Sequence, residues 1–391
     1  MNEGRPMTSK QRFLAALERR LPDRLPVTTH HVMDSFLKKY MGGASTQEFF
    51  EAFGLDPILW VAAHKPDASR GDYFDPDQPP PGERDPRRTS SDLWRVVETP
   101  LPHPEYTTTR YDFRTPKKNL SMVLQGNEHT AWIAERLVKE KSDIDLIARY
   151  ATAPLCDVDE VNRRAGEFGE RGLVRGMMCG FDVYGQAGCW QDAACLYGIE
   201  KLILATFDDP AWVHAFLKIL FERKRTFVRS MRGARFDLVE HGGGDASSTV
   251  ISPKIFDEFV APYDAELTRL ARLAGQRVVY HTCGGMMPIL ERLAALKPDA
   301  LETFTPPDMG GDTILKEAKR RVGAQVCMIG GFDQFHFFLG CTPEATRREV
   351  RRCFEAAGEG GGFILSPSDH FFDADLELIR AYADEARRCV Y

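Results

Sequence analysis

Residues 277–303 read RVVYHTCGGMMPILERLAALKPDALET and change from a strand-like pattern to a helix-like one and back. The apolar run Arg277–Thr282 contains β-branched residues, and a glycine-containing loop follows it. Apolar residues then recur at helical spacing over Met287–Leu296, before a second short apolar run at Ala300–Thr303. Two strands joined by a helix lie parallel, so this stretch predicts one strand–helix–strand unit of a covered parallel sheet.

The same alternation of strand and helix continues over most of the chain from about residue 130. Further strands are predicted at Leu173–Met178, Phe236–His241, Gln325–Ile329 and Gly362–Ser366, and further helices at Pro253–Ala274 and Pro343–Ala357. The rhythm predicts the α/β class, and the length favours a (β/α)8 TIM barrel. An open doubly wound sheet has the same periodicity, but no G-x-G-x-x-G follows an early strand, which weakens its nucleotide-binding form.

The N-terminal third is less regular. Thr8–Gln11 has the pattern of a capping box and predicts a helix to about Arg20, followed by a first short strand at Leu25–His31. Three β-rich segments come later, at Leu93–Glu98, Tyr106–Phe113 and Leu120–Gln125. We interpret residues from about 85 to 125 as a β-hairpin insertion, within a single barrel domain that spans residues 1–391.

Composition and charge exclude several classes of protein. The 391 residues are 43% hydrophobic and 28% charged, with a formal net charge of −6, which is typical of a globular chain. Basic residues cluster only briefly, as at Arg347–Arg352, where a solvated helix face explains them better than nucleic-acid binding. No apolar stretch has transmembrane length or resembles a leader, and nine cysteines show no framework spacing. We expect a cytoplasmic protein without nucleic-acid or membrane partners.

Polar, glycine-rich loops follow four of the predicted strands. They are Gly242–Thr249 (GGGDASST), His281–Gly285 (HTCGG), Gly330–Asp333 (GGFD) and Ser366–His370 (SPSDH). Each loop alone has ordinary turn chemistry. In a barrel, however, these loops meet at one rim, where catalytic groups gather, so together they predict an active site.

The pair His281-x-Cys283 is the sharpest feature of these loops. Residues two apart share one face of a strand, so both side chains can point to one metal ion. Neutral imidazole and thiolate are good zinc ligands. The pair alone also fits a buried histidine and a buried cysteine that bind nothing.

Several segments together resemble the uroporphyrinogen decarboxylase superfamily. They are Ser9–Leu17 (SKQRFLAAL), Pro22–Val27 (PDRLPV), Ile251–Phe256 (ISPKIF), His281–Gly284 (HTCG) and Gly330–Asp333 (GGFD). The resemblance runs nearly from end to end and is weakest over the hairpin insertion. It implies a (β/α)8 barrel whose site lies at the carboxyl ends of the strands.

The superfamily contains two chemistries, and this chain departs from the first. The resemblance implies that decarboxylases hold a polycarboxylate porphyrinogen with arginines just after the first strand. Here residues 30–36 read HHVMDSF and contain no arginine. A polyanion without its cationic clamp binds poorly, which argues against decarboxylation. A carboxy-lyase and a catalytically degenerate barrel that only binds remain alternatives.

The second chemistry is zinc-dependent methyl transfer. The resemblance implies an H-x-C pair and a further cysteine after the last strand. His281 and Cys283 match the pair, and Asp369 stands at the position of the third ligand, with His370 and Cys327 as alternatives. Asp369 keeps the negative charge of a zinc–thiolate centre, whereas neutral His370 does not, so we expect Asp369.

The resemblance also implies the partners and the remaining roles. We expect a zinc ion, and a corrinoid on a separate carrier protein, with a small thiol or methoxylated compound as substrate. We assign catalytic roles to His370, Asp245 and Glu240, and substrate contacts to Ser247, Asp333 and His241. Three further cysteines, Cys179, Cys189 and Cys195, match no zinc pattern and are expected to pack in the interior.

Overall fold

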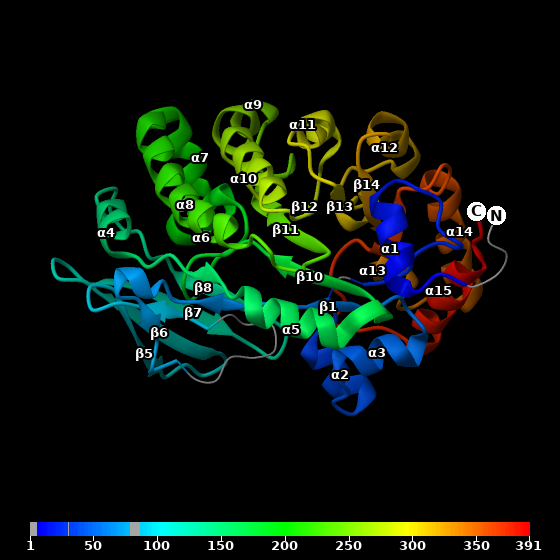
Figure 1. Cartoon of the computed structure of the whole chain (residues 1–391), viewed down its shortest axis with the longest axis horizontal. Helices are drawn as coiled ribbons and strands as arrows, with labels where there is room; N and C mark the ends of the chain where they lie inside the picture. The colour runs from blue at the N-terminus through cyan, green and yellow to red at the C-terminus, as the bar shows by residue number, and fades with distance from the viewer. Residues whose placement is uncertain (1–5, 30, 79–86) are drawn as a thin grey trace.

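The computed structural model describes residues 6–29, 31–78 and 87–391, and its centre is a seven-stranded parallel sheet in chain order (Figure 1). The strands are β1 (Ile58–Trp60), β10 (Leu173–Met177), β11 (Leu238–Gly242), β12 (Val278–His281), β13 (Ala300–Thr303), β14 (Cys327–Phe332) and β15 (Phe363–Pro367). Every neighbouring pair is parallel. The predicted α/β class and barrel-type sheet are confirmed, and six of the strands were predicted to within a few residues.

A single residue closes the ring between the first and last strands. Val27 forms a parallel bridge with Leu365, and the backbone N–H of Asp56, just before β1, donates to the carbonyl of Val27 at 2.8 Å. The predicted strand Leu25–His31 is therefore reduced to one bridge, and His30 lies outside the described residues. Pro26 has no N–H to donate, which weakens a ladder at this point. The short strand β1 was not predicted.

Helices surround the sheet in an arc that runs over the top and right of Figure 1. They include α8 (Pro210–Ser230), α10 (Ala261–Leu273), α11 (Leu290–Ala295), α12 (Leu315–Val322), α14 (Pro343–Ala357) and α15 (Leu376–Arg388). Helix α1 (Ser9–Leu17) begins at the predicted capping box of Thr8 and Gln11. The predicted helix Pro253–Ala274 is interrupted by a π-helical turn at Phe256–Val260. Pro262 follows this turn and lacks the N–H that a regular helix needs there.

The remaining helices connect or extend the barrel. They are α2 (Asp34–Met41), α3 (Thr46–Phe53), α4 (Asp143–Tyr150), α5 (Val158–Phe168), α6 (Cys189–Tyr197), α7 (Ile199–Asp208), α9 (Pro253–Ile255) and α13 (Gln334–Phe337). Within the described part of the chain, no helix combines the length and apolarity needed to cross a bilayer.

The chain forms a separate antiparallel sheet between β1 and β10 of the sequence, and this sheet lies at the lower left of Figure 1. Its strands are β5 (Arg95–Leu101), β6 (Thr107–Arg114), β7 (Leu120–Gly126) and β8 (Ala131–Glu135). The predicted β-hairpin is not confirmed, because the segment has a fourth strand, and residues 79–86 of its beginning lie outside the described part. Trp94 and Phe113 pack with Phe181 of the barrel at ring-centroid distances of 6.2 and 6.4 Å. The inserted sheet therefore shares the main core.

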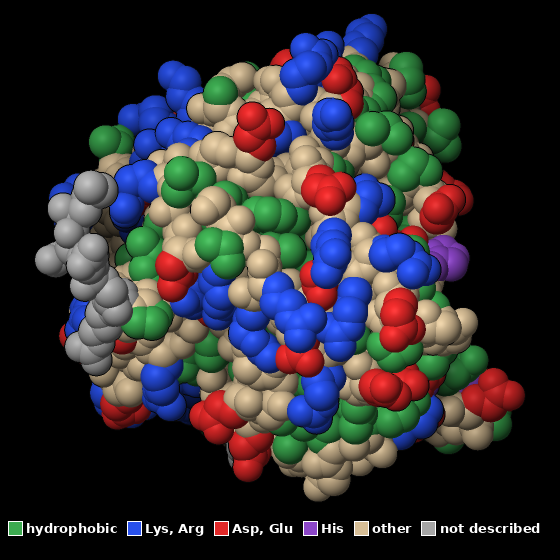
Figure 2. Space-filling model, turned by 90° about the vertical axis from the view of Figure 1, so that its right-hand side faces the viewer, with side chains coloured by type: hydrophobic (Ala, Val, Ile, Leu, Met, Phe, Trp, Pro, Cys, Tyr) green, Lys and Arg blue, Asp and Glu red, His purple; other side chains and the backbone are tan. Residues whose placement is uncertain are grey.

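The basic residues of α14 are balanced by acidic neighbours. Arg351 pairs with Glu385 at 2.5 Å, and Arg352 pairs with Glu349 at 2.6 Å. Figure 2, which faces this side of the molecule, shows Lys and Arg side chains interspersed with Asp and Glu. This mixture is typical of a solvated helix face rather than a nucleic-acid stripe.

Candidate active site

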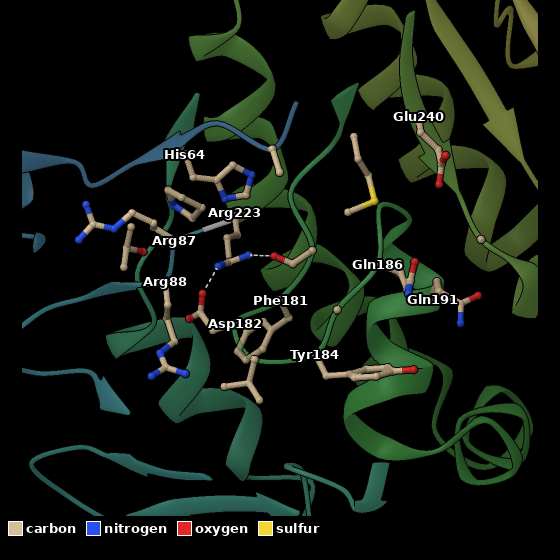
Figure 3. A pocket seen from close by; sticks show the side chains of 18 of the residues that line it. His64, Arg87, Arg88, Phe181, Asp182, Tyr184, Gln186, Gln191, Arg223 and Glu240 are labelled. Carbon is tan, nitrogen blue, oxygen red and sulfur yellow. Dashed lines mark hydrogen bonds and ion pairs between the residues drawn. The ribbon is translucent and has the colours of Figure 1, made fainter. Parts of the chain in front are cut away.

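A cavity of about 790 Å³ lies between the carboxyl ends of the parallel strands and the inserted sheet. Glu240 and His281 line it from the barrel, and Glu98 and Tyr111 line it from strands β5 and β6. Figure 3 shows part of this lining. The volume is in the range of cavities that hold small molecules or cofactors.

A buried ionic cluster lies at the barrel end of the cavity. The guanidinium of Arg175 on β10 contacts Glu240 on β11 at 2.6 Å and Glu302 on β13 at 3.0 Å, and makes a further short contact with Glu302. The three side chains are 1%, 8% and 2% exposed. Arg175 also lies 4.6 Å from the ring centroid of Trp60. Charged groups persist at such burial only when they neutralise one another.

His281 joins this cluster to Cys283. Its Nδ1 lies 2.9 Å from Glu302, and its Nε2 lies 3.1 Å from the sulfur of Cys283. Burial lowers the pKa of His281, but Cys283, Glu240 and Glu302 raise it, and the net pKa lies well above the usual value. Without a metal, His281 is therefore protonated, with Nδ1 facing the carboxylate of Glu302 and Nε2 facing the sulfur of Cys283.

The donor set fits a divalent metal ion. One ligand atom from each of Glu240, His281 and Glu302 can be chosen so that the three atoms lie within 4.8 Å of one another. Carboxylate and imidazole are both ligands of zinc. Cys283 contacts His281 but belongs neither to this group of three nor to the cavity lining. Glu240 and Glu302 together carry two negative charges against the single positive charge of Arg175, so a further cation would balance the buried charge of the cluster.

A family model described as uroporphyrinogen decarboxylase (URO-D) matches residues 180–389, which is more than half of the chain. This chain belongs to the uroporphyrinogen decarboxylase family. Uroporphyrinogen decarboxylase of Neisseria meningitidis serogroup C is 35% identical over 127 residues, which cover 31% of this chain and 33% of that protein. Methylated-thiol–coenzyme M methyltransferase of Methanosarcina mazei is 22% identical over 190 residues, covering 49% and 48%.

The fold of the family is shared over almost the whole chain. The solved structure of a methyltransferase from Methanosarcina mazei superposes with a TM-score of 0.59, covering 98% of this chain and 99% of that one at 16% identity. This likeness shows the fold. The matched segments span less than half the length of the two curated relatives, so neither relative's activity transfers by comparison alone.

The URO-D fold brings some of the predicted metal ligands together but not all of them. His281 and Cys283 are in contact. Asp369 is outside the cavity lining, and its carboxylate accepts from the backbone N–H of His370 at 2.7 Å, whereas His370 itself lines the cavity. Cys327 is fully buried at the start of β14, the opposite end of the strand from the site, and burial raises its pKa to about 12. Cys327 therefore lies apart from the strand ends that carry His281 and Cys283.

The predicted catalytic and substrate residues are also distributed unevenly. Glu240 and His370 line the cavity, and Asp245 stands behind Gln191, which lines it. The side-chain amide of Gln191 donates to Asp245 at 2.8 Å, and burial raises the pKa of Asp245. Ser247 is buried and contacts Thr249 at 3.0 Å, whose hydroxyl accepts from the backbone N–H of Gly285 at 2.9 Å. Ser247 thus supports the loop that carries Cys283.

Neither Asp333 nor His241 lines the cavity. Asp333 caps helix α13 and contacts the imidazole of His336 at 2.8 Å. His241 is fully buried beside Asp264, at 3.3 Å, because alternate residues of β11 face opposite sides of the sheet. Ser247, Asp333 and His241 are thus not among the residues that line the cavity, and their contacts with a substrate stay a prediction.

The analysis of the sequence missed Arg175 and Glu302. A signal was present, since each is a charged residue inside a short apolar strand. A charge in such a position requires a partner inside the barrel. Cys179, Cys189 and Cys195 are buried, and burial raises their pKa values, as expected for packing residues.

Proposed function

We propose that the chain is a zinc-dependent methyltransferase that moves a methyl group between a corrinoid on a partner protein and a small thiol or methoxylated substrate. The supporting observation is the contact of His281 Nε2 with the sulfur of Cys283 at 3.1 Å, at the carboxyl end of β12 and beside buried carboxylates. The relationship to a methylated-thiol–coenzyme M methyltransferase agrees with it.

We propose His281 Nε2 and Cys283 Sγ as two of the zinc ligands. Both oxygens of Glu302 already bind Arg175, and one of them also accepts from His281 Nδ1. This bond fixes the tautomer in which Nε2 is available to a metal. Glu240 binds Arg175 through Oε2 and lines the cavity, so its second oxygen is the better third ligand. The charge argument that favoured Asp369 applies equally to Glu240.

When bound, zinc would lower the pKa of a substrate thiol and keep it nucleophilic. Glu302 holds the proton of His281 at Nδ1, and Arg175 limits the negative charge that surrounds the thiolate. Trp60 stacks on His31 at a ring-centroid distance of 4.8 Å and lies against Arg175 of the cluster. His370 lines the cavity at 37% side-chain exposure and can pass the thiol proton to solvent.

The carboxy-lyase alternative keeps one observation in its favour, the 35% identity to a uroporphyrinogen decarboxylase over a third of that protein. Among the residues that the structure describes, three arginines line the cavity, and two of them are paired with carboxylates. From these residues a substrate with many carboxylates would meet little unpaired positive charge. We therefore prefer methyl transfer.

The proposed function is tested by methyl transfer from methylcobalamin to coenzyme M, followed by the change in the cobalamin absorption spectrum. We expect zinc-dependent demethylation by the wild type and none by Cys283→Ser. Cys341→Ser alters a partly exposed thiol outside the cavity lining and is the matched control. Demethylation that survives removal of zinc, or equal rates in both variants, contradicts the proposal.

A further inference from the structure

The loop that follows β10 contains a strained turn in the wall of the cavity. Val183 has a φ of 73°, and the backbone N–H of Tyr184 donates to the carbonyl of Asp182 at 2.9 Å. A hydrogen bond that spans one residue of positive φ defines the rare, strained form of the γ-turn. A β-branched residue is an especially uncommon occupant of this backbone conformation. All three residues line the cavity.

Buried groups fix the residue before the strained one. Asp182 is 8% exposed, and one of its carboxylate oxygens contacts Arg223 of α8 at 2.5 Å (Figure 3). The other oxygen accepts from the indole N–H of Trp94, which directly precedes β5, at 3.1 Å. Arg223 also donates to the backbone carbonyls of Thr152 and Gly180. A barrel helix and the inserted segment thus hold Asp182 together.

A second buried ion pair fixes the two sides of the turn. Asp192 of α6 is 1% exposed, and one of its oxygens accepts from the backbone N–H groups of Phe181 at 3.2 Å and Gln186 at 2.6 Å. Its other oxygen contacts Lys224 of α8 at 2.7 Å. Lys224 donates to the carbonyls of Cys179 at 2.7 Å and Gln186 at 2.6 Å. Strained backbone persists where its surroundings over-determine it, and such places cluster at ligand sites.

The turn presents the ring of Tyr184 to the cavity. The hydroxyl of Tyr184 donates to the carbonyl of Ala131 on β8 at 3.3 Å, so the side chain reaches from the barrel to the inserted sheet. Figure 3 shows the ring extending from the turn towards the side on which Gln186 and Gln191 lie. Glu240 lines the same cavity, so a ligand on this ring shares the cavity with the candidate metal cluster.

We propose that Tyr184 is a substrate-contacting residue that binds an aryl group, and that the strained turn at Val183 positions its ring. An aromatic ring stacks favourably on a second aromatic ring, beyond the gain from buried area alone. Further aromatic side chains in the described lining, Trp60, Tyr111 and Phe181, fit the same class of ligand. Assigning the aryl group to a methoxylated substrate rests on the proposed function. The aryl contact itself does not require zinc.

The aryl contact is tested by equilibrium binding of 4-methoxybenzyl alcohol and its saturated analogue (4-methoxycyclohexyl)methanol, measured by calorimetry on metal-free and zinc-loaded protein. Both probes are uncharged, and we expect the wild type to bind the aryl probe about two- to tenfold more tightly. Tyr184→Leu should remove this preference, whereas Tyr184→Phe keeps the ring and should retain most of it. Tyr106→Leu is the matched control, because Tyr106 belongs to the inserted segment outside the cavity lining, and it should bind as the wild type does.

The positioning role is tested by Val183→Gly and Val183→Ala, which both remove the isopropyl group. At an ordinary position alanine is the more stabilising of the two. At a φ of 73° glycine is unstrained and alanine is not, so Val183→Gly should unfold at the higher urea concentration. It should nevertheless bind the aryl probe about threefold more weakly than Val183→Ala, because the turn no longer orients the ring of Tyr184. A merely structural role would give stability and affinity the same order.

Equal binding of the two probes by the wild type, no binding of the aryl probe, or an unchanged aryl preference in Tyr184→Leu overturns the aryl contact. Greater stability of Val183→Ala, or equal or tighter aryl binding by Val183→Gly, overturns the positioning role of the turn. An aryl preference in a protein that catalyses no methyl transfer would retain this inference and refute only the proposed function. Zinc-dependent methyl transfer without any aryl preference would do the reverse.

Discussion

Replacing Arg175 by methionine should destabilise the fold strongly, because it removes one cation from between two buried carboxylates. Removal of one partner from a buried ion pair costs about 3–5 kcal/mol. Arg175 serves both Glu240 and Glu302, which are 8% and 2% exposed, so we expect a loss near the upper end, about 5 kcal/mol. The methionine side chain fills much of the space of the Arg175 side chain, so lost packing makes only a minor contribution to this loss of stability.

The loss is measured as the free energy of unfolding in urea. Converting Glu240 and Glu302 to glutamine in the Arg175→Met background should recover most of it, since no buried charge then lacks a partner. Zinc should also stabilise Arg175→Met, by about 2.7 kcal/mol at a concentration one hundred times its Kd. The reasoning is refuted if Arg175→Met unfolds like the wild type, or if the triple variant is no more stable than Arg175→Met.

Three further predictions follow from the site. Glu302→Gln should weaken zinc affinity by about 10- to 100-fold in a chelator competition, because His281 loses the carboxylate that orients it, while Asp369→Ala should change affinity little. A greater loss of zinc affinity in Asp369→Ala than in Glu302→Gln would indicate that Asp369, in the loop after the last strand, is the third ligand. Burial and the charge of Arg223 lower the pKa of His64 from 6.5 to about 3, so below pH 6.5 the unfolded chain binds a proton that the folded protein does not. The free energy of unfolding therefore has its full value above pH 6.5 and falls by up to about 1.4 kcal/mol per pH unit below it. His64→Phe should flatten this slope between pH 5 and 6.5, and an unchanged slope would contradict a neutral buried imidazole. Uroporphyrinogen should not be converted to coproporphyrinogen anaerobically, and efficient conversion would favour the carboxy-lyase.

Periodicity predicted the parallel strands because their apolar residues and flanking helices are encoded locally. Residues 300–303 and 343–357 have the predicted bounds. The reduction of the predicted strand Leu25–His31 to one bridge at Val27, and the short β1, could not be predicted, since each depends on pairing with distant strands. The fourth strand of the inserted sheet pairs with β7, but it is only five residues long and none of them is buried, so its own pattern is weak.

The candidate site was predictable where its residues are neighbours in sequence. His281 and Cys283 share one strand end, and spacing alone indicated that they meet. Arg175, Glu240 and Glu302 come from three strands, and only the closed sheet brings them together. Asp369 was favoured by its charge and position, but position along a loop does not fix where a short side chain points.

The most direct test of the account is the zinc content of the purified chain and of two variants. We expect one zinc ion per chain in the wild type and in Cys341→Ser, and loss of the metal in Cys283→Ser, because the thiolate is one of few protein ligands. Cobalt substitution of the wild type should add a thiolate-to-metal absorption band that is absent from Cys283→Ser. Equal zinc in wild type and Cys283→Ser, or a wild type that binds no zinc at any concentration tested, would contradict the metal centre at His281 and Cys283.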